Sequence, residues 1–220
     1  MRKLSCLALL FSMLLLQSCF EIIEQLDLKT DGSGKLQLVL NMSKSKTRLN
    51  SIMKMKTVNG HRVPDQDEIR RKLVDFEKDL KATPGITNIK TSLDFENFIV
   101  TLNCDFVNVN SLNTGIKKIA EKSKNKNPLQ NSFDYDIAGK TFSRLNKFLI
   151  KDEYDKMSNA DKEIFATANY TNIFRFDTEV ISASNRDSKI AANKKAVMLK
   201  LNALDIISNK KSIENKIKLK

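Results

Sequence analysis

The side chains best suited to chemistry are few in this sequence of 220 residues. They are one histidine, His61, and three cysteines, Cys6, Cys19 and Cys104. A zinc site needs three or four ligands of the His, Cys or carboxylate type, and a nucleophile needs a neighbouring base. His61 lies in a polar loop with no such neighbours along the chain. We therefore expect no metal site, no cofactor and no catalytic residue.

The eighteen residues that precede Cys19 follow a recognisable pattern of charge and hydropathy. A positively charged start precedes an apolar run over residues 4–16, and Gln17 and Ser18 lead directly to Cys19. This order of charge, apolar run and small residue is typical of a secretory signal peptide. The apolar run is too short for a bilayer-spanning helix, which needs about 20 residues. The alternatives are a signal anchor and a secreted protein with an incidental cysteine.

The residues that end at Cys19 resemble the lipobox of bacterial lipoproteins, which is a leucine, two mostly small residues and a cysteine. The resemblance implies that residues 1–18 are a lipoprotein signal peptide, cut between Ser18 and Cys19. It further implies diacylglycerol on the Cys19 thiol, a palmitate-type acyl chain on the new amino group, and an anchor in a lipid bilayer of the cell envelope. Phe20 is not the aspartate that retains lipoproteins in the inner membrane under the best-known sorting rule, so the outer membrane is the expected location.

The remaining chain, residues 19–220, is long enough for one domain. Only Cys104 remains beside Cys19, so no intrachain disulfide is expected and an apolar core must hold the fold. The formal net charge of the whole chain is +12, from 38 basic and 26 acidic residues. Of the basic residues 30 are lysine and 8 are arginine, and asparagine occurs 21 times. Phosphate-reading sites favour arginine, so we exclude nucleic acid and attribute the excess lysine to A/T-rich codons or to a membrane-facing basic surface.

Alternating apolar residues predict the elements that position these groups. Residues 20–42 are expected to form a hairpin around the turn at 31–34, although Ile23 and Glu24 break the alternation. Because pairing would begin within about three residues of Cys19, the folded body should sit close to the bilayer. Cys104 falls in an alternating row over 98–106, which predicts a buried, unreactive thiol.

Helical spacing and turn signals complete the prediction. A short helix is expected within 43–57, with Met53 and Met55 as core residues; the alternative is that the two methionines form a soft binding face. Asp65 and Glu68 have the spacing of a capping box before an amphipathic helix. A subdomain boundary is placed near 124–131. Further strands are expected over 86–93, 98–106, 133–137, 170–176, 196–202 and 213–219, and a further helix over 112–119.

Four features together resemble lipoproteins with an LppM-type domain. They are Cys19 running directly into a strand, Asp31-Gly32-Ser33-Gly34, Pro84-Gly85-Ile86 after a helix, and the spacing Tyr170, Phe174, Phe176, Asn185. The resemblance implies an α+β fold and an envelope role linked to lipid. It carries over no catalytic residue.

The fold class expected is α+β, with an antiparallel sheet built from hairpins and packed on one face by two or three helices. The expected function is a membrane-anchored, non-enzymatic binding or scaffolding module for lipid, glycan or another envelope protein. The alternative is a hydrolase or transferase acting on an envelope polymer. Paired carboxylates can cleave glycosidic bonds, but Asp134 with Asp136 and Asp65 with Asp67 are ordinary surface pairs.

Overall fold

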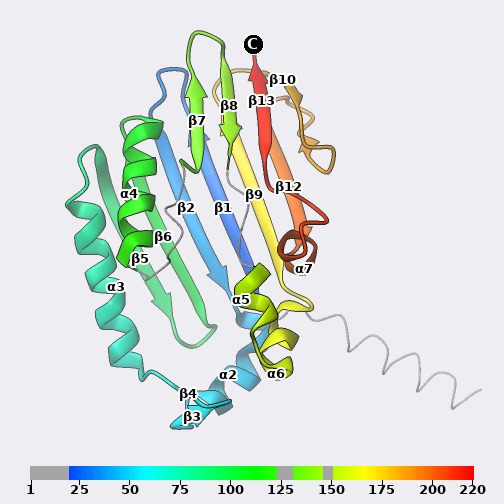
Figure 1. The fold of residues 1–220 in the computed structure, drawn as a ribbon. Helices are drawn as coiled ribbons and strands as arrows, with labels where there is room; N and C mark the ends of the chain where they lie inside the picture. The colour runs from blue at the N-terminus through cyan, green and yellow to red at the C-terminus, as the bar shows by residue number, and fades with distance from the viewer. Residues whose placement is uncertain (1–19, 123–130, 146–150) are drawn as a thin grey trace, which may run out of the picture.

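The computed structural model describes residues 20–122, 131–145 and 151–220, and its centre is a seven-stranded sheet (Figure 1). The order of the strands is β11-β12-β9-β1-β2-β6-β5. Their bounds are β1 (Glu21–Leu28), β2 (Gly34–Asn41), β5 (Ile86–Asp94), β6 (Ile99–Phe106), β9 (Asn169–Phe176), β11 (Lys189–Ile190) and β12 (Ala196–Asn202).

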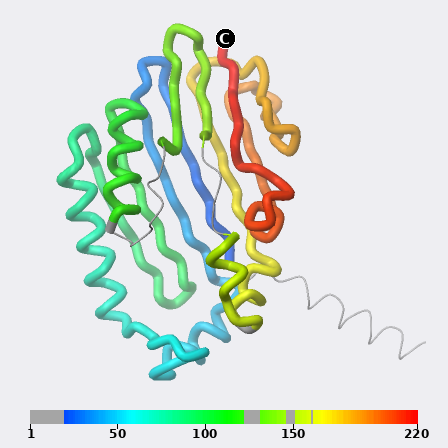
Figure 2. Tube along the Cα trace, viewed as in Figure 1, coloured from blue at the N-terminus to red at the C-terminus, as the bar shows by residue number. Residues whose placement is uncertain are grey.

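The sheet is mixed because β1 and β9 run parallel while every other neighbouring pair is antiparallel. Glu21 pairs with Asn169 and Leu28 with Phe176, so both strands start at the same end of the sheet (Figure 2). The predicted hairpin over 20–42 is confirmed, with Gly32 at a φ of 85° in its turn. The α+β class is confirmed as well.

One face of this sheet is covered by two helices and a second sheet (Figure 1). The helices are α3 (Gln66–Lys81) and α4 (Val109–Lys122). The second sheet has the order β10 (Val180–Ala183), β13 (Asn215–Leu219), β8 (Thr141–Arg144) and β7 (Phe133–Asp136). Helices on one face were predicted, but the second sheet as a further cover was not.

The long helix α3 begins and ends as its sequence predicts. The Asp65 side chain accepts a hydrogen bond of 2.7 Å from the backbone N–H of Glu68, which satisfies a free donor of the first turn. After the helix ends, the chain turns over residues 83–86, where Gly85 has a φ of 79° in the left-handed region. A Cβ at Gly85 would also lie 2.4 Å from the Ser111 hydroxyl, so the turn requires glycine there.

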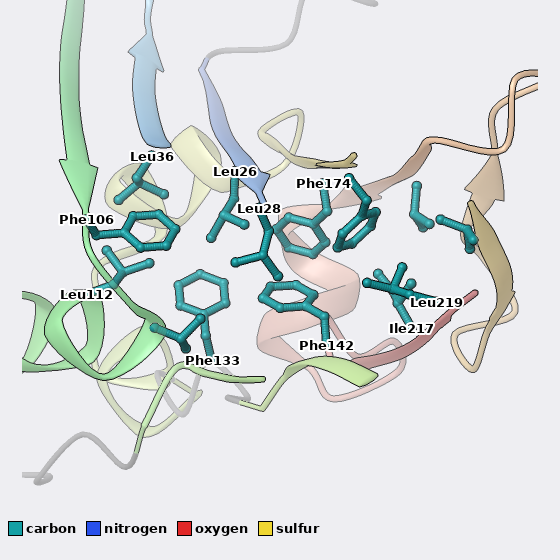
Figure 3. Packing of buried hydrophobic residues seen from close by; sticks show 14 of the residues in the cluster. Leu26, Leu28, Leu36, Phe106, Leu112, Phe133, Phe142, Phe174, Ile217 and Leu219 are labelled. Carbon is teal, nitrogen blue, oxygen red and sulfur yellow. The ribbon is translucent and has the colours of Figure 1, made fainter. Parts of the chain in front are cut away.

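The main core lies between the two sheets and is rich in phenylalanine (Figure 3). Phe133, Phe142 and Phe174 have no exposed surface. The ring centroids of Phe142 and Phe174 lie 5.2 Å apart at 71°, and those of Phe133 and Phe142 lie 5.8 Å apart. Such edge and offset contacts add to the free energy gained by burying the rings.

Short elements gather at the end of the large sheet where β1 begins (Figure 1). They are η1 (Ser43–Ser45), α2 (Lys46–Ile52), β3 (Thr57–Val58), β4 (His61–Arg62), α5 (Lys151–Asp155), α6 (Asn159–Lys162), η2 (Glu163–Phe165) and α7 (Ala203–Ile207). The predicted short helix after residue 43 is confirmed. The prediction of Met55 as a core residue is wrong, because its side chain is 52% exposed.

Several sequence predictions fall outside the described residues. They are the signal peptide over 1–18, the cleavage and lipidation site at Ser18 and Cys19, and nearly all of the boundary proposed near 124–131. Within the described ranges, no helix combines the length and the apolar character needed to span a bilayer.

Candidate functional site

The structure places Phe20 at the start of the large sheet, directly after Cys19. The backbone N–H of Asn169 donates to the Phe20 carbonyl at 3.0 Å, and β1 begins at Glu21. The prediction that pairing starts within about three residues of Cys19 is therefore confirmed. Three extended residues reach only about 10 Å. A lipid on Cys19 would consequently hold this end of the sheet close to the bilayer.

Two small apolar depressions lie on either side of Phe20. The first, of about 90 Å³, is lined by Phe20, Ile22, Phe165, Asn169, Tyr170, Ala203, Ile206 and Ile207. The second, of about 60 Å³, is lined by Phe20, Met42, Ser45, Arg48, Leu49, Ile52 and Ile164. Ligand pockets for small molecules usually measure roughly 300–1,000 Å³. These depressions therefore form an uneven apolar surface and no enclosed pocket.

Contacts between aromatic rings support the apolar surface around Phe20. The rings of Phe20 and Phe165 meet edge to face with centroids 5.7 Å apart, and Phe165 meets Tyr154 in the same way at 5.6 Å. These contacts fix the first residue of the sheet against α5 and η2. Ile22 and Ile164 nevertheless stay 37% and 36% exposed. The start of the sheet is ordered but incompletely covered.

Next to Phe20 lies a stretch that we call the basic segment, residues 43–62. It contains six Lys or Arg residues and no Asp or Glu. None of its residues is fully buried. The six cations are Lys44, Lys46, Arg48, Lys54, Lys56 and Arg62.

Most of these cations form no ion pair with a carboxylate of the described residues. Lys46 lies 3.4 Å from Glu96, and Arg62 pairs with Glu68. The other four have no carboxylate oxygen within 4.0 Å among the described residues, and all four are exposed. The basic segment thus carries a concentrated and largely uncompensated positive charge beside an apolar surface.

The elements α5, α6 and η2 border both Phe20 and the basic segment, and they carry carboxylates that are engaged locally. Asp155 pairs with Lys151 at 2.6 Å. Asp161 accepts hydrogen bonds from Asn59 at 3.0 Å and from the Ser158 hydroxyl at 2.7 Å, and these bonds lower its pKa. Asp161 also lies 3.8 Å from His61, the single histidine, which is largely exposed.

Midway along β1, a buried ion pair occupies the core face. Glu24 and Arg144 are each 6% exposed, and the Arg144 Nε lies 3.2 Å from the Glu24 carboxylate. The Tyr170 hydroxyl donates to the same carboxylate, and Arg144 donates to the Ser132 carbonyl at 3.1 Å. Each charge is therefore paired and hydrogen-bonded, as a buried charge requires.

The same contacts determine the pKa of Arg144 and of Tyr170. Burial alone would lower the pKa of Arg144, but the Glu24 carboxylate outweighs it and raises that pKa. Burial and the Glu24 charge together raise the pKa of Tyr170 far above its ordinary value. The cluster is therefore built to hold β1, β8 and β9 together, with the guanidinium charged and the phenol neutral.

Cys104 lies on the core face of β6 with 3% exposure, as the alternating row predicts. Burial raises the pKa of its thiol to about 11, so almost none is thiolate at neutral pH. The predicted burial is confirmed. Among the described residues, no group of three or more His, Cys, Asp or Glu side chains is arranged to hold a metal ion.

The opposite face of the large sheet carries a broad polar hollow of about 550 Å³. Gln25, Gln37 and Asn103 form a chain of side-chain hydrogen bonds across three strands, at 2.7 and 2.8 Å. The carboxylates of the hollow are engaged. Asp27 pairs with Arg175 at 3.3 Å, and Asp105 accepts a hydrogen bond of 2.7 Å from Asn88. This hollow offers hydrogen bonds to a polar ligand.

Sequence reasoning found the place of Phe20 but missed the basic segment as a surface. Its signal was present: six cations without one carboxylate, interleaved with apolar residues. Glu24 was noted only as a break in the strand pattern, and its partner Arg144 could not be identified from spacing.

Comparison with solved structures finds a likeness over most of the chain. A solved structure, the NMR structure of the folded domain of the Mycobacterium tuberculosis protein LppM, matches with a TM-score of 0.42 and 8% sequence identity. The match covers 91% of this chain and 89% of that chain. No protein-family model and no curated protein matches the sequence.

Proposed function

We propose that this protein is a non-enzymatic lipoprotein of the bacterial cell envelope, anchored through acylated Cys19. Its folded body serves as a binding or scaffolding module for lipid, glycan or another envelope protein. The observation that supports the proposal is the missing spacer: sheet pairing begins at the Phe20 carbonyl, one residue after Cys19. A body attached this closely works at the bilayer surface, whereas a body that works at a distance needs a tether.

Fatty-acid labelling in a bacterial host tests the anchor. The parent protein should incorporate labelled palmitate and appear in the membrane fraction. Cys19→Ala should lose the label and be found either in the soluble exported fraction or uncut in the inner membrane. Cys104→Ala is the matched control. The Cys104 thiol is buried, so its removal should leave labelling unchanged. Equal labelling of Cys19→Ala and the parent would refute the anchor.

The location in the outer membrane is the finer part of the proposal and rests on Phe20. Density separation should place the parent with outer-membrane markers. Phe20→Asp should move the protein to the inner membrane, while Phe20→Asn, which removes the same ring without adding a charge, should not. A parent protein found with inner-membrane markers would contradict this assignment.

A pulldown from solubilised membranes, with lipids and proteins both identified, would name what the body binds. Variants of the polar hollow, such as Gln37→Ala, separate ligands held on that face from those held at the anchored end. A ligand lost in Gln37→Ala but kept in variants of the basic segment would belong to the hollow.

A further inference from the structure

We propose that the basic segment and the apolar surface around Phe20 form one docking surface for an anionic phospholipid bilayer. The inference rests on the proposed function, since a lipid on Cys19 would bring this end to the membrane. It goes further by naming the ligand class, anionic headgroups, and the residues that meet them.

The charge of the basic segment matches such a surface. Lys44, Arg48, Lys54 and Lys56 are exposed, and none has a carboxylate oxygen within 4.0 Å among the described residues. A cation within a Debye length, about 10 Å, of an anionic leaflet strengthens binding by about fivefold. Lysine is suited to this role because a diffuse layer of headgroups needs point charge and no bidentate geometry.

The apolar residues of the same segment supply the second component. The helix α2 buries no residue fully, although helices of globular domains normally turn an apolar stripe to the core. Leu49 and Ile52 instead line the depression next to Phe20, and Met55 is 52% exposed. An apolar face flanked by lysines is the pattern of elements that lie in a membrane interface.

The position of the segment joins these two components to the anchor. One depression is lined by both Phe20 and residues of α2, so the basic segment touches the first residue after Cys19. Figure 1 shows α2, β3 and β4 at the end of the sheet where β1 begins. The bilayer is therefore the surface that a lipid on Cys19 would present to them.

The neighbouring residues 151–165 explain why docking should be oriented. They contain five carboxylates and three lysines, so they repel an anionic surface while the basic segment beside them is attracted. The body should tilt onto the basic segment, which brings Met55 to the interface. Ile137, 56% exposed in the turn after β7 at the opposite end, should remain in water.

The test uses tryptophan fluorescence, since the chain has no tryptophan of its own. The full chain, isolated from the membranes of a bacterial host and carrying either Met55→Trp or Ile137→Trp, is reconstituted on vesicles of phosphatidylcholine alone or mixed with phosphatidylglycerol. Tryptophan at position 55 should shift to shorter wavelength and be quenched by brominated acyl chains on the anionic vesicles only. Tryptophan at position 137 should report water on both.

Charge variants in the Met55→Trp background decide whether the basic segment is responsible. Changing Lys44, Arg48, Lys54 and Lys56 to Gln should lower the docked-to-undocked ratio by about 600-fold, which is fivefold for each of four cations, and high salt should also lower it. The control changes four exposed lysines at the other end of the sheet, Lys29, Lys140, Lys194 and Lys195, to Gln and should leave the shift intact. Circular dichroism verifies that each variant is folded.

The outcomes separate this inference from the anchor. If the chain floats with both vesicle types but tryptophan at position 55 stays in water on the anionic ones, docking is wrong and the anchor stands. If the chain floats only with anionic vesicles and position 55 is quenched, docking stands and the anchor is wrong. An equal loss of the shift in both charge variants would show attraction to net charge alone and would overturn the assigned surface.

Discussion

The core between the two sheets and the basic segment treat apolar side chains in opposite ways. At the far end, the second sheet encloses Phe133, Phe142 and Phe174 with no exposed surface (Figure 3). At the end next to Cys19, the basic segment has no fully buried residue, and Met55 is 52% exposed. The anchored end also has a buried cluster of its own, which includes Tyr170, Leu199 and Leu201. The difference therefore concerns the basic segment alone, which retains apolar surface for contact with something else.

This contrast has a physical consequence for substitutions. Burial contributes roughly 25 cal/mol for each Å² of apolar surface removed from water. Truncation in the core between the sheets should therefore lower the free energy of unfolding, whereas truncation in the basic segment should leave it almost unchanged and alter membrane contact instead.

Phe142→Ala should lower the free energy of unfolding by about 3–5 kcal/mol, because it leaves a cavity among packed rings. The ring of Phe142 lies within 6 Å, centroid to centroid, of the rings of Phe133, Phe174 and Phe176. Leu49→Ala at the near end should cost under about 1 kcal/mol. Urea unfolding of both variants gives the comparison, and similar losses would contradict the division.

Glu24→Gln should cost about 3–5 kcal/mol, since it leaves the charge of Arg144 buried without its partner. The double variant Glu24→Leu with Arg144→Met should recover most of that stability, because two apolar residues of similar volume need no partners. Thermal unfolding of the two variants measures the difference. A double variant as unstable as the single one would show that the pair contributes more than mutual neutralisation.

The elements of the fold that depend on neighbouring residues were predictable. The hairpin of β1 and β2, the cap of α3 at Asp65 and the row containing Cys104 follow from alternation, helical spacing and turn residues. The parallel pairing of β1 with β9 was not, because it joins distant segments and no local pattern encodes a partner. The second sheet was missed for the same reason: its strands are short and come from three parts of the chain.

The features of the candidate site likewise divide into those that the sequence predicts and those that require the fold. The closeness of Phe20 to the sheet could be predicted, since it needs only the position of the first strand. The exposure of Met55 could not, because apolar residues at helical spacing fit either a core or a surface contact. The partnership of Glu24 with Arg144 required the fold, which alone brings β1 and β8 together.

Cys104→Ala should cost about 1–2 kcal/mol, a smaller loss because a small side chain leaves a small cavity. The raised pKa adds a pH dependence: an unfolded thiol ionises near 9.0 and the folded one near 11. The stability that the thiol contributes is thus complete below pH 9 and is lost as the pH rises toward 11. Urea unfolding of parent and variant from pH 7 to 11 should show their difference shrinking, and rapid labelling of native Cys104 by a thiol reagent would contradict its burial.

The smallest effect on stability, and the sharpest on function, should come from a ten-residue Gly/Ser linker inserted after Cys19. Such a linker has an average span of about 17 Å, which carries the near end beyond a Debye length of the bilayer. The sheet still begins at Phe20, so the unfolding midpoint and fatty-acid labelling should match the parent.

Complementation of a deletion strain should nevertheless fall, because the basic segment and Phe20 would no longer be held at the membrane. Insertion of the same linker at the far end, in the turn between β7 and β8, is the matched control and should complement normally. Full activity of the near-end insertion would show that the exposed apolar surface beside Cys19 does not act through contact with the bilayer, and its exposure would need another partner.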